Sequence, residues 1–241
     1  MRSGPNIAAL AGLIGEPGRA AMLGALCDGQ ALPAGELAGI AGLSAQAASG
    51  HLAKLVDGGL LAVERQGRHR YYRLANIQVA SVLEGLATLA GPPSPRAPAS
   101  QTLEAERLRQ ARTCYDHLAG ALGVEVAAAL EARSILVDAG DKRLEITGPG
   151  KEWLMEAFAI EVAALRPGRH GLACRCLDWS QRRHHVAGPL GTALLRQFFE
   201  FGWLRRVSGS RAVRVTAAGQ AGLHHVLGFS PTIIAPSGER R

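Results

Sequence analysis

Apolar residues recur every three to four positions near both ends of the first ninety residues, which is the spacing of an amphipathic helix. The segment 7–26 is rich in Ala and Leu and is interrupted at 15–18, where Pro17 fits the first turn of a new helix. In segment 76–90, Asn76 is a candidate N-cap, and the regularly spaced apolar residues are Val79, Val82, Leu83, Leu86 and Leu89. We therefore expect helices in both segments.

Residues 33–73 show a different pattern. Two short helical segments are joined by Gly42-Leu43, and two strand-like runs then flank Gln66-Gly67-Arg68. Ser44 is a natural N-cap of the second helix, because its hydroxyl can accept an unpaired backbone N–H. The buried stripe of this helix is predicted to consist of Leu52, Leu55 and Val56. A short helix-turn-helix followed by a hairpin is the pattern of a winged helix, whose second helix can enter a DNA major groove.

The remaining residues of the second helix and the hairpin are small, polar or basic. Gln can pair with adenine edges, whereas Lys and Arg can pair with guanine or phosphate. Gly50 has no side chain and cannot specify a base. The alternative to DNA contact is that these side chains form an ordinary solvated helix face. The predicted DNA contacts are Ser44, Gln46, Ser49, His51, Lys54, Arg65, Arg68, His69 and Arg70.

The segments LSAQAASGHLAKLVDGGLL and VERQGRHRYYRL resemble the DNA-binding core of the ArsR-type winged helix-turn-helix repressors. The resemblance covers roughly residues 5–90 and implies a dimeric repressor that an effector releases from its DNA operator. Metal-sensing members carry cysteines before the recognition helix, or histidines and acidic ligands in the last helix of the domain. Here LPAGELAGIAGL has no cysteine and ANIQVASVLEGLATLA has no histidine. The resemblance therefore implies the fold and the DNA-binding role but not the usual inducer sites.

A proline-rich stretch at 91–98 separates this region from the second half of the chain. Beyond it, the order helix, strand, Gly-containing turn, strand and helix occurs over 127–154 and again from residue 194, with Thr-x-x-Gly at the start of each last helix. The first domain has the same order, so we predict three degenerate copies of one element, with chance similarity as the alternative.

The predicted fold is mostly α with small β-hairpins: an N-terminal winged helix-turn-helix and a C-terminal α+β domain with winged-helix-like repeats. The outer helices of the first domain, Ile7–Leu13 and Val79–Leu89, have more apolar surface than a small domain needs and are assigned to a homodimer interface. The expected domains are 1–90 for DNA binding and dimerisation, 91–100 as linker, 101–228 for effector sensing and 229–241 as a flexible tail.

Composition narrows the class of protein further. The chain of 241 residues can hold two domains, and it has no apolar run of membrane-spanning length. Residues 1–19 lack a long apolar segment followed by a small-residue cleavage site, so we do not expect secretion. Four cysteines are too few for a disulfide framework at this length, so we expect a cytoplasmic protein without a membrane partner. The net charge of +7 favours a polyanionic partner. The excess of Arg over Lys is weaker support, because together with the abundance of Ala and Gly it reflects codon bias more than phosphate recognition.

The second half contains two groups of chemically active side chains: one at Cys114 and His117, the other within 166–185, with Cys174, Cys176, Asp178, His184 and His185. Cys114 and His117 lie three residues apart and are predicted to share one face of a helical turn. Thiols and imidazoles could bind a soft or borderline metal, neighbouring Arg residues could activate a thiol or hold an anion, and free cysteines are often simply buried. We expect an effector pocket here, with a metal, anionic or small-molecule effector left open. Its predicted residues are Cys114, His117, Cys174, Cys176, Asp178 and Trp179.

These features favour a dimeric repressor that binds a double-stranded DNA operator and responds to an effector. The alternatives are an enzyme that uses the Cys/His/Asp group, with the winged helix as a regulatory appendage, and a winged-helix module that binds protein. No ordered nucleophile–base pair, phosphate loop or paired-acid motif supports the enzyme. The basic hairpin beside a polar helix argues against the protein-binding module. We therefore expect a regulator and not an enzyme.

Overall fold

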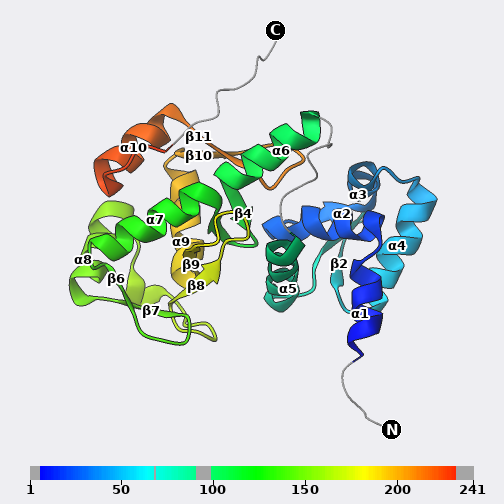
Figure 1. Ribbon diagram of the computed structural model, residues 1–241, viewed down its shortest axis with the longest axis horizontal. Helices are drawn as coiled ribbons and strands as arrows, with labels where there is room; N and C mark the ends of the chain where they lie inside the picture. The colour runs from blue at the N-terminus through cyan, green and yellow to red at the C-terminus, as the bar shows by residue number, and fades with distance from the viewer. Residues whose placement is uncertain (1–5, 68, 91–98, 232–241) are drawn as a thin grey trace. The chain divides into compact units, whose positions relative to one another are not determined.

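The computed structural model describes residues 6–67, 69–90 and 99–231 (Figure 1). These residues form two compact units, Met1–Glu84 and Gly85–Arg241. The predicted linker 91–100 lies outside the described residues except for Ala99 and Ser100, which begin a helix. Most of the predicted tail, 232–241, also lies outside them. No helix among the described residues is long and apolar enough to span a membrane.

The N-terminal unit follows the predicted order of elements. Pro17 is the first residue of α2, as predicted from the preference of proline for the first turn of a helix. The core contains Met22, Leu23, Leu37 and Leu74, all at most 1% exposed. The elements are α1 (Ile7–Ile14), α2 (Pro17–Ala25), a 3-10 turn (Leu26–Asp28), β1 (Leu32–Pro33), α3 (Ala34–Ala41), α4 (Ala45–Asp57), β2 (Leu61–Gln66), β3 (His69–Leu74) and α5 (Ile77–Ala90).

The helix-turn-helix consists of α3 and α4. Gly42 ends α3 with a φ of 64°, a left-handed conformation that glycine adopts without strain. Ser44 caps α4, as predicted, by accepting the Ala47 N–H at 3.3 Å. Of the predicted stripe, Leu52 and Leu55 are fully buried, whereas Val56 is only half-buried. The local signals therefore place α4 on the core with one face left exposed.

The wing is the antiparallel hairpin of β2 and β3, and β1 adds a third strand on the outer side of β3. The register runs from Leu61 opposite Leu74 to Gln66 opposite His69. Gly67, at the tip, has a φ of 60°, which favours glycine. The predicted winged helix-turn-helix is confirmed.

The C-terminal unit combines helices with short antiparallel sheets. The strand order of its largest sheet is β6-β7-β8-β9. The elements are α6 (Ala99–Gln110), β4 (Arg112–Cys114), β5 (His117–Ala119), α7 (Gly120–Ala132), β6 (Leu136–Asp138), β7 (Arg143–Ile146), α8 (Gly148–Phe158), a 3-10 turn (Val162–Ala164), β8 (Ala173–Leu177), β9 (His184–Ala187), α9 (Gly188–Glu200), β10 (Leu204–Arg206), β11 (Val213–Val215) and α10 (Ala217–Leu227).

The two predicted copies of the helix–hairpin–helix element are present in this unit, as α7-β6-β7-α8 and α9-β10-β11-α10. Thr147 caps α8 and Thr216 caps α10, and each hydroxyl accepts the N–H of the glycine three residues later. That glycine has no room for a side chain: a Cβ on Gly150 would lie 2.6 Å from the Ile135 carbonyl oxygen, and one on Gly219 would collide with the Trp203 carbonyl oxygen. The Thr-x-x-Gly motif therefore packs the start of each second helix against the residue that precedes the first strand of its hairpin, Ile135 before β6 and Trp203 before β10.

Each copy extends further back than the sequence pattern indicated, because a hairpin precedes both α7 and α9. The repeat is therefore hairpin, helix, hairpin, helix, over 112–158 and 173–227. The second hairpin of the first repeat pairs with the first hairpin of the second repeat, through β7 and β8. Reciprocally, Thr113 on β4 donates its N–H to the Arg211 carbonyl at 2.9 Å, next to β11. Each repeat thus forms backbone hydrogen bonds with strand residues of the other repeat, and this exchange of strand pairing joins the two.

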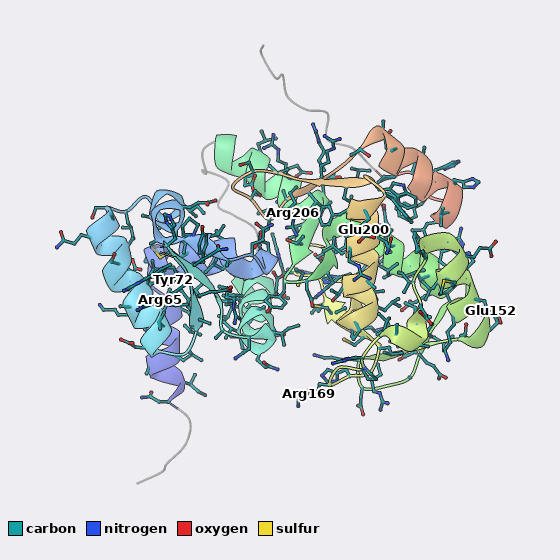
Figure 2. All side chains as sticks on the ribbon, turned by 180° about the vertical axis from the view of Figure 1, so that it is seen from behind. Arg65, Tyr72, Glu152, Arg169, Glu200 and Arg206 are labelled. Carbon is teal, nitrogen blue, oxygen red and sulfur yellow. The ribbon has the colours of Figure 1, made fainter. Side chains whose placement is uncertain are left out.

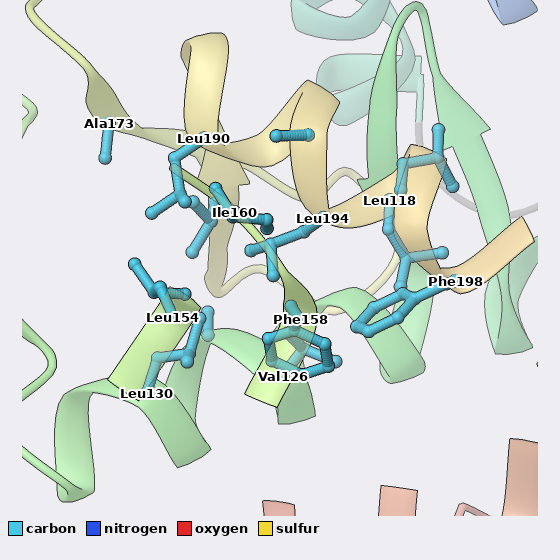
Figure 3. Close-up of a cluster of buried hydrophobic side chains, with 14 of the residues drawn as sticks. Leu118, Val126, Leu130, Leu154, Phe158, Ile160, Ala173, Leu190, Leu194 and Phe198 are labelled. Carbon is cyan, nitrogen blue, oxygen red and sulfur yellow. The ribbon is translucent and has the colours of Figure 1, made fainter. Parts of the chain in front are cut away.

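One apolar core lies beneath both repeats (Figure 3). Phe158, at the end of α8, is fully buried and packs edge-on against Phe198 of α9, with ring centroids 5.5 Å apart. Leu130 from α7 and Leu190 from α9 are also fully buried. Because both repeats supply these side chains, neither repeat has a separate core.

Candidate functional sites: a nucleic-acid interface and a cysteine–histidine cluster

The outer face of α4 carries exposed polar side chains, namely those of Gln46, Ser49 and Lys54. Ser49 donates its hydroxyl to the Ala45 carbonyl oxygen at 2.9 Å and retains acceptor capacity. Gly50 lies among them in open space, since nothing approaches within 4 Å of where its Cβ would be. This face is unobstructed within its own unit.

His51 is placed differently from the other predicted contacts on α4. Its Nδ1 lies 3.2 Å from Arg19 Nη1 and 3.2 Å from Glu16 Oε2, at the start of α2. Arg19 also donates to the carbonyl oxygens of Leu13 and Gly12, at 2.6 and 2.8 Å. His51 therefore connects α4 to α2 and does not join the exposed polar face.

The wing carries exposed basic residues on both strands. Arg65 of β2 lies directly opposite Arg70 of β3, and His69 is exposed at the start of β3. Arg68 lies outside the described residues. Figure 2 labels Arg65 and Tyr72 on this hairpin; Tyr72 is 8% exposed and packs inward. The wing is therefore a basic ribbon with an apolar inner side.

Cys114 and His117 do not lie on a helix, and that prediction is wrong. They form the last cross-strand pair of the β4–β5 hairpin, on either side of Tyr115 and Asp116. Tyr115 has a φ of 59°, so the chain turns back instead of continuing as a helix. The two side chains still meet, because residues opposite each other in a hairpin lie as close as those one helical turn apart.

The second repeat presents an equivalent pair from its own first hairpin. Cys176 of β8 lies opposite His185 of β9, and Cys174 lies two residues earlier on β8, opposite Ala187. The loop between the strands is longer here and carries Asp178. Cys176 therefore corresponds to Cys114 and His185 to His117, whereas Cys174 lies outside this correspondence.

These two pairs converge into one cluster, the Cys/His cluster, which consists of Cys114, His117, Cys176 and His185. One potential ligand atom from each residue lies within 4.8 Å of the others. The Nε2 atoms of the two histidines are 3.2 Å apart. Cys114, His117 and His185 are at most 4% exposed, and Cys176 is half-buried. The neighbouring Cys176 thiol and burial raise the pKa of Cys114 to about 12.

Each histidine of the cluster has a carboxylate behind it. Asp116 Oδ1 lies 3.0 Å from His117 Nδ1, and Thr192 donates its hydroxyl to the other oxygen of Asp116 at 2.9 Å. Asp178 Oδ2 lies 3.4 Å from His185 Nδ1, which is ion-pair distance without hydrogen-bond geometry. In each ring Nδ1 faces a carboxylate and Nε2 faces the cluster, so Nε2 is the ring nitrogen that each histidine presents there.

Asp178 is a buried anchor for this region and not a pocket wall. Its side chain is 0% exposed, as is that of Arg112, whose Nη2 donates to it at 3.0 Å. The Gly120 N–H, at the start of α7, donates to the same carboxylate at 2.6 Å. Burial acts to raise the pKa of Asp178, but His185, Arg112, Ser180 and Gly120 outweigh it and hold that pKa well below its usual value. Asp178 therefore stays charged.

Trp179 belongs to the same supporting layer. The guanidinium of Arg112 stacks over its ring, 4.6 Å from the ring centroid, which is a cation–π arrangement. Of the six predicted effector residues, the structure thus gathers Cys114, His117 and Cys176 in the cluster. Asp178 and Trp179 lie behind it, and Cys174 lies beside it.

Three residues of this site, His185, Arg112 and Asp116, are not among the six predicted effector residues, although His185 belongs to the group noted at 166–185. The usable signal was a second internal repeat, HLAGALG at 117–123 and HVAGPLG at 185–191. Its glycines allow the repeats to approach closely. A Cβ on Gly191 would lie 3.1 Å from that of His117, and one on Gly123 would lie 3.4 Å from that of His185. Each histidine therefore packs against the helix of the other repeat.

The fold of the N-terminal unit, with an exposed polar recognition helix and a basic wing, defines a winged helix-turn-helix DNA-binding protein. Residues 14–64 match a family described as "Helix-turn-helix domain". Over 216 residues the chain is 42% identical to the HTH-type transcriptional regulator YdfF of Bacillus subtilis (strain 168), covering 90% of this chain and 94% of that protein. The chain belongs to the family of HTH-type transcriptional regulators.

Solved structures resemble a smaller part of the chain. The winged helix-turn-helix domain of Mb0332 from Mycobacterium bovis, titled homodimeric and a possible ArsR-family regulator, is 23% identical, with a TM-score of 0.33, and the match covers 37% of this chain and 90% of that one. The cadmium sensor CMTR from Mycobacterium tuberculosis is 30% identical, with a TM-score of 0.31, and the match covers 38% and 95%. The fold of the N-terminal unit and the match to the HTH-type regulator confirm the predicted winged helix-turn-helix regulator.

Proposed function

We propose that the chain is a dimeric repressor that binds a pseudo-palindromic operator through α4 and the wing and is released by an effector held in the C-terminal unit. The observation that carries the DNA-binding step is the exposed polar face of α4 next to the opposed Arg65 and Arg70 of the wing. Gln46, Ser49 and Lys54 contact base edges or phosphates, while the wing arginines contact the backbone. Half-sites lie about one helical turn apart.

The dimer interface is proposed on α1 and α5, with a second copy of this chain as the partner. No residue of α1 is buried, although the helix is apolar, and Ile7 is 71% exposed. Along α5, Val82 and Leu86 are 45% and 43% exposed. Apolar helix faces of this kind are covered in an isologous two-fold interface.

The DNA-binding proposal predicts a specific change in salt dependence. Replacing Arg65 and Arg70 together by Ala should weaken binding to promoter DNA and to unrelated duplex alike, because phosphate contacts carry no sequence information. Loss of two phosphate contacts should reduce the slope of log affinity against log salt by about 2. Fluorescence anisotropy titrations on both duplexes over a salt series measure this slope.

Two further variants complete this test. Arg196→Ala removes an arginine with a 66% exposed side chain on α9 and should leave the slope unchanged. Gln46→Ala should instead alter the preferred sequence, with a discrimination loss of about 1–3 kcal/mol at one base pair. A wild-type protein without affinity for its own promoter at low salt would contradict the proposal.

The dimer proposal predicts that Leu86→Glu produces monomers that bind operator far more weakly, because a charge in an apolar two-fold interface occurs on both sides of it. Sedimentation velocity reports the assembly state, and anisotropy reports the affinity. Met155→Glu on α8, at a position 46% exposed, serves as the control and should remain dimeric. An unchanged dimer in Leu86→Glu would place the interface elsewhere.

The C-terminal unit is proposed to sense the effector. Its Cys/His cluster is a concentrated group of buried chemically active side chains that the DNA-binding role does not use. The relative that matches over 90% of the chain is named as a regulator, which supports a regulatory role over the enzyme alternative. An operator partner also requires the compartment that holds the chromosome, in agreement with the cytoplasmic location expected from the sequence.

A further inference from the structure

We infer that the Cys/His cluster is a tetrahedral binding site for a borderline divalent cation of the Zn²⁺ class, with Cys114 and His117 from one repeat and Cys176 and His185 from the other as its ligands. The site itself does not depend on DNA binding. That this cation is the effector of the C-terminal unit rests on the proposed function.

The distances within the cluster suit such a cation. Zn–N bonds of about 2.0–2.1 Å in a tetrahedron separate two nitrogens by about 3.3 Å, and Zn–S bonds of about 2.3 Å separate two sulfurs by about 3.8 Å. The Nε2 atoms of His117 and His185 are 3.2 Å apart, and the separations among all four ligand atoms stay within 4.8 Å. Coordination therefore needs only small side-chain adjustments.

The orientation of the histidines gives an independent reason. Asp116 lies behind Nδ1 of His117 and Asp178 behind Nδ1 of His185, so the Nε2 atom of each ring faces the cluster. A carboxylate behind the outer nitrogen is the usual support of a metal-bound histidine, and it leaves Nε2 as the ligand atom.

The pairing of the ligands supports the same conclusion. Each hairpin holds one thiol directly opposite one imidazole, so each repeat presents a preformed two-ligand unit. Each histidine packs against a glycine of the other repeat, His117 against Gly191 and His185 against Gly123, and this brings the two units together. Two sulfurs and two imidazole nitrogens gathered in one largely buried cluster favour Zn²⁺, whereas carboxylate-rich sites suit Mg²⁺ or Ca²⁺.

Titration of the reduced full-length protein with Co²⁺ tests the site directly. Tetrahedral thiolate ligation should produce the visible d–d bands and the near-ultraviolet thiolate-to-cobalt band at an equimolar end point, and Zn²⁺ should displace Co²⁺ and remove the bands. Cys176→Ser and His185→Gln should each lower the affinity for Zn²⁺ by more than about 100-fold, since they remove a ligand where even a supporting residue accounts for about 10–100-fold.

The chain provides matched controls for both variants. Cys174→Ser changes a thiol on the same strand, and His184→Gln changes the adjacent exposed imidazole. Both should retain the cobalt spectrum and the wild-type affinity. Circular dichroism in the absence of metal verifies that each variant folds. The inference is overturned if reduced wild-type protein shows no cobalt–thiolate band, or if the control variants lose as much affinity as the ligand variants.

Operator binding then separates the two levels of the proposal. If the cation is the effector, Zn²⁺ should change the operator affinity of wild-type and Cys174→Ser protein but not that of Cys176→Ser. If Co²⁺ gives the expected bands, Zn²⁺ removes them and operator affinity does not change, the metal site stands and its role as effector is overturned. If no operator is bound under any condition, the proposed function fails while the spectroscopic result is unaffected.

Discussion

Asp178→Asn should destabilise the C-terminal unit by about 3–5 kcal/mol, the usual effect of removing one partner from a buried ion pair. The substitution leaves the Arg112 guanidinium charged and 0% exposed without its anion. It also weakens the acceptor of the Gly120 N–H at the start of α7. A loss of this size is a large fraction of the stability of an ordinary domain, so the protein should unfold at a much lower temperature.

Tryptophan fluorescence is a suitable measurement, because all three tryptophans of the chain, Trp153, Trp179 and Trp203, lie in the C-terminal unit. The matched control is Asp138→Asn. The Asp138 carboxylate lies 2.7 Å from Arg175 Nη1, and the Asp138 side chain is 59% exposed. An exposed pair of this kind contributes little to stability, because solvent screens it. Equal destabilisation by the two variants would show that Asp178 has no special structural role.

Phe158→Ala should also lower the stability of the C-terminal unit by about 3–5 kcal/mol, through lost burial and the cavity that the missing ring leaves. Phe158 is 0% exposed and lies edge-on to Phe198 (Figure 3). It is also edge-on to Trp153 and Trp203. Because this core is shared by the two repeats, the loss should affect the whole unit in one transition. Chemical unfolding followed by tryptophan fluorescence and by circular dichroism should show coincident midpoints.

The control for this variant is Phe201→Ala, at a position 41% exposed beside the same cluster. Folding buries less of this ring than of the Phe158 ring, so the expected loss of stability is smaller. Separate midpoints for the two probes in Phe158→Ala would contradict a shared core and would indicate that the repeats unfold independently.

The N-terminal unit could be predicted closely because its signals are local. The Ser44 cap and the Gly67 turn each act within a few residues, and they define where α4 begins and where the wing turns. His51 is the exception, since its contact with Glu16 and Arg19 joins residues far apart in sequence. Helical spacing alone placed it on the exposed face.

The cluster was only partly predictable, for two physical reasons. A spacing of three residues, as between Cys114 and His117, brings side chains together both in a helical turn and across a two-residue hairpin, so spacing could not distinguish them. The choice of His185 over His184 depends on strand register, because a shift of one residue moves a side chain to the opposite face. Register was set by pairing with β8, and only the repeated HLAGALG and HVAGPLG segments indicated it in advance.

The exchange of strand pairing between the repeats has a consequence for how the two proposed assemblies respond to dilution. The cluster takes two residues from each repeat, and both repeats belong to one polypeptide, so its halves meet at a fixed effective concentration. The operator-binding dimer, by contrast, joins separate chains and dissociates by mass action as the protein becomes scarce. Occupancy of the cluster should therefore follow the free ligand level alone, while operator occupancy also follows the number of protein copies.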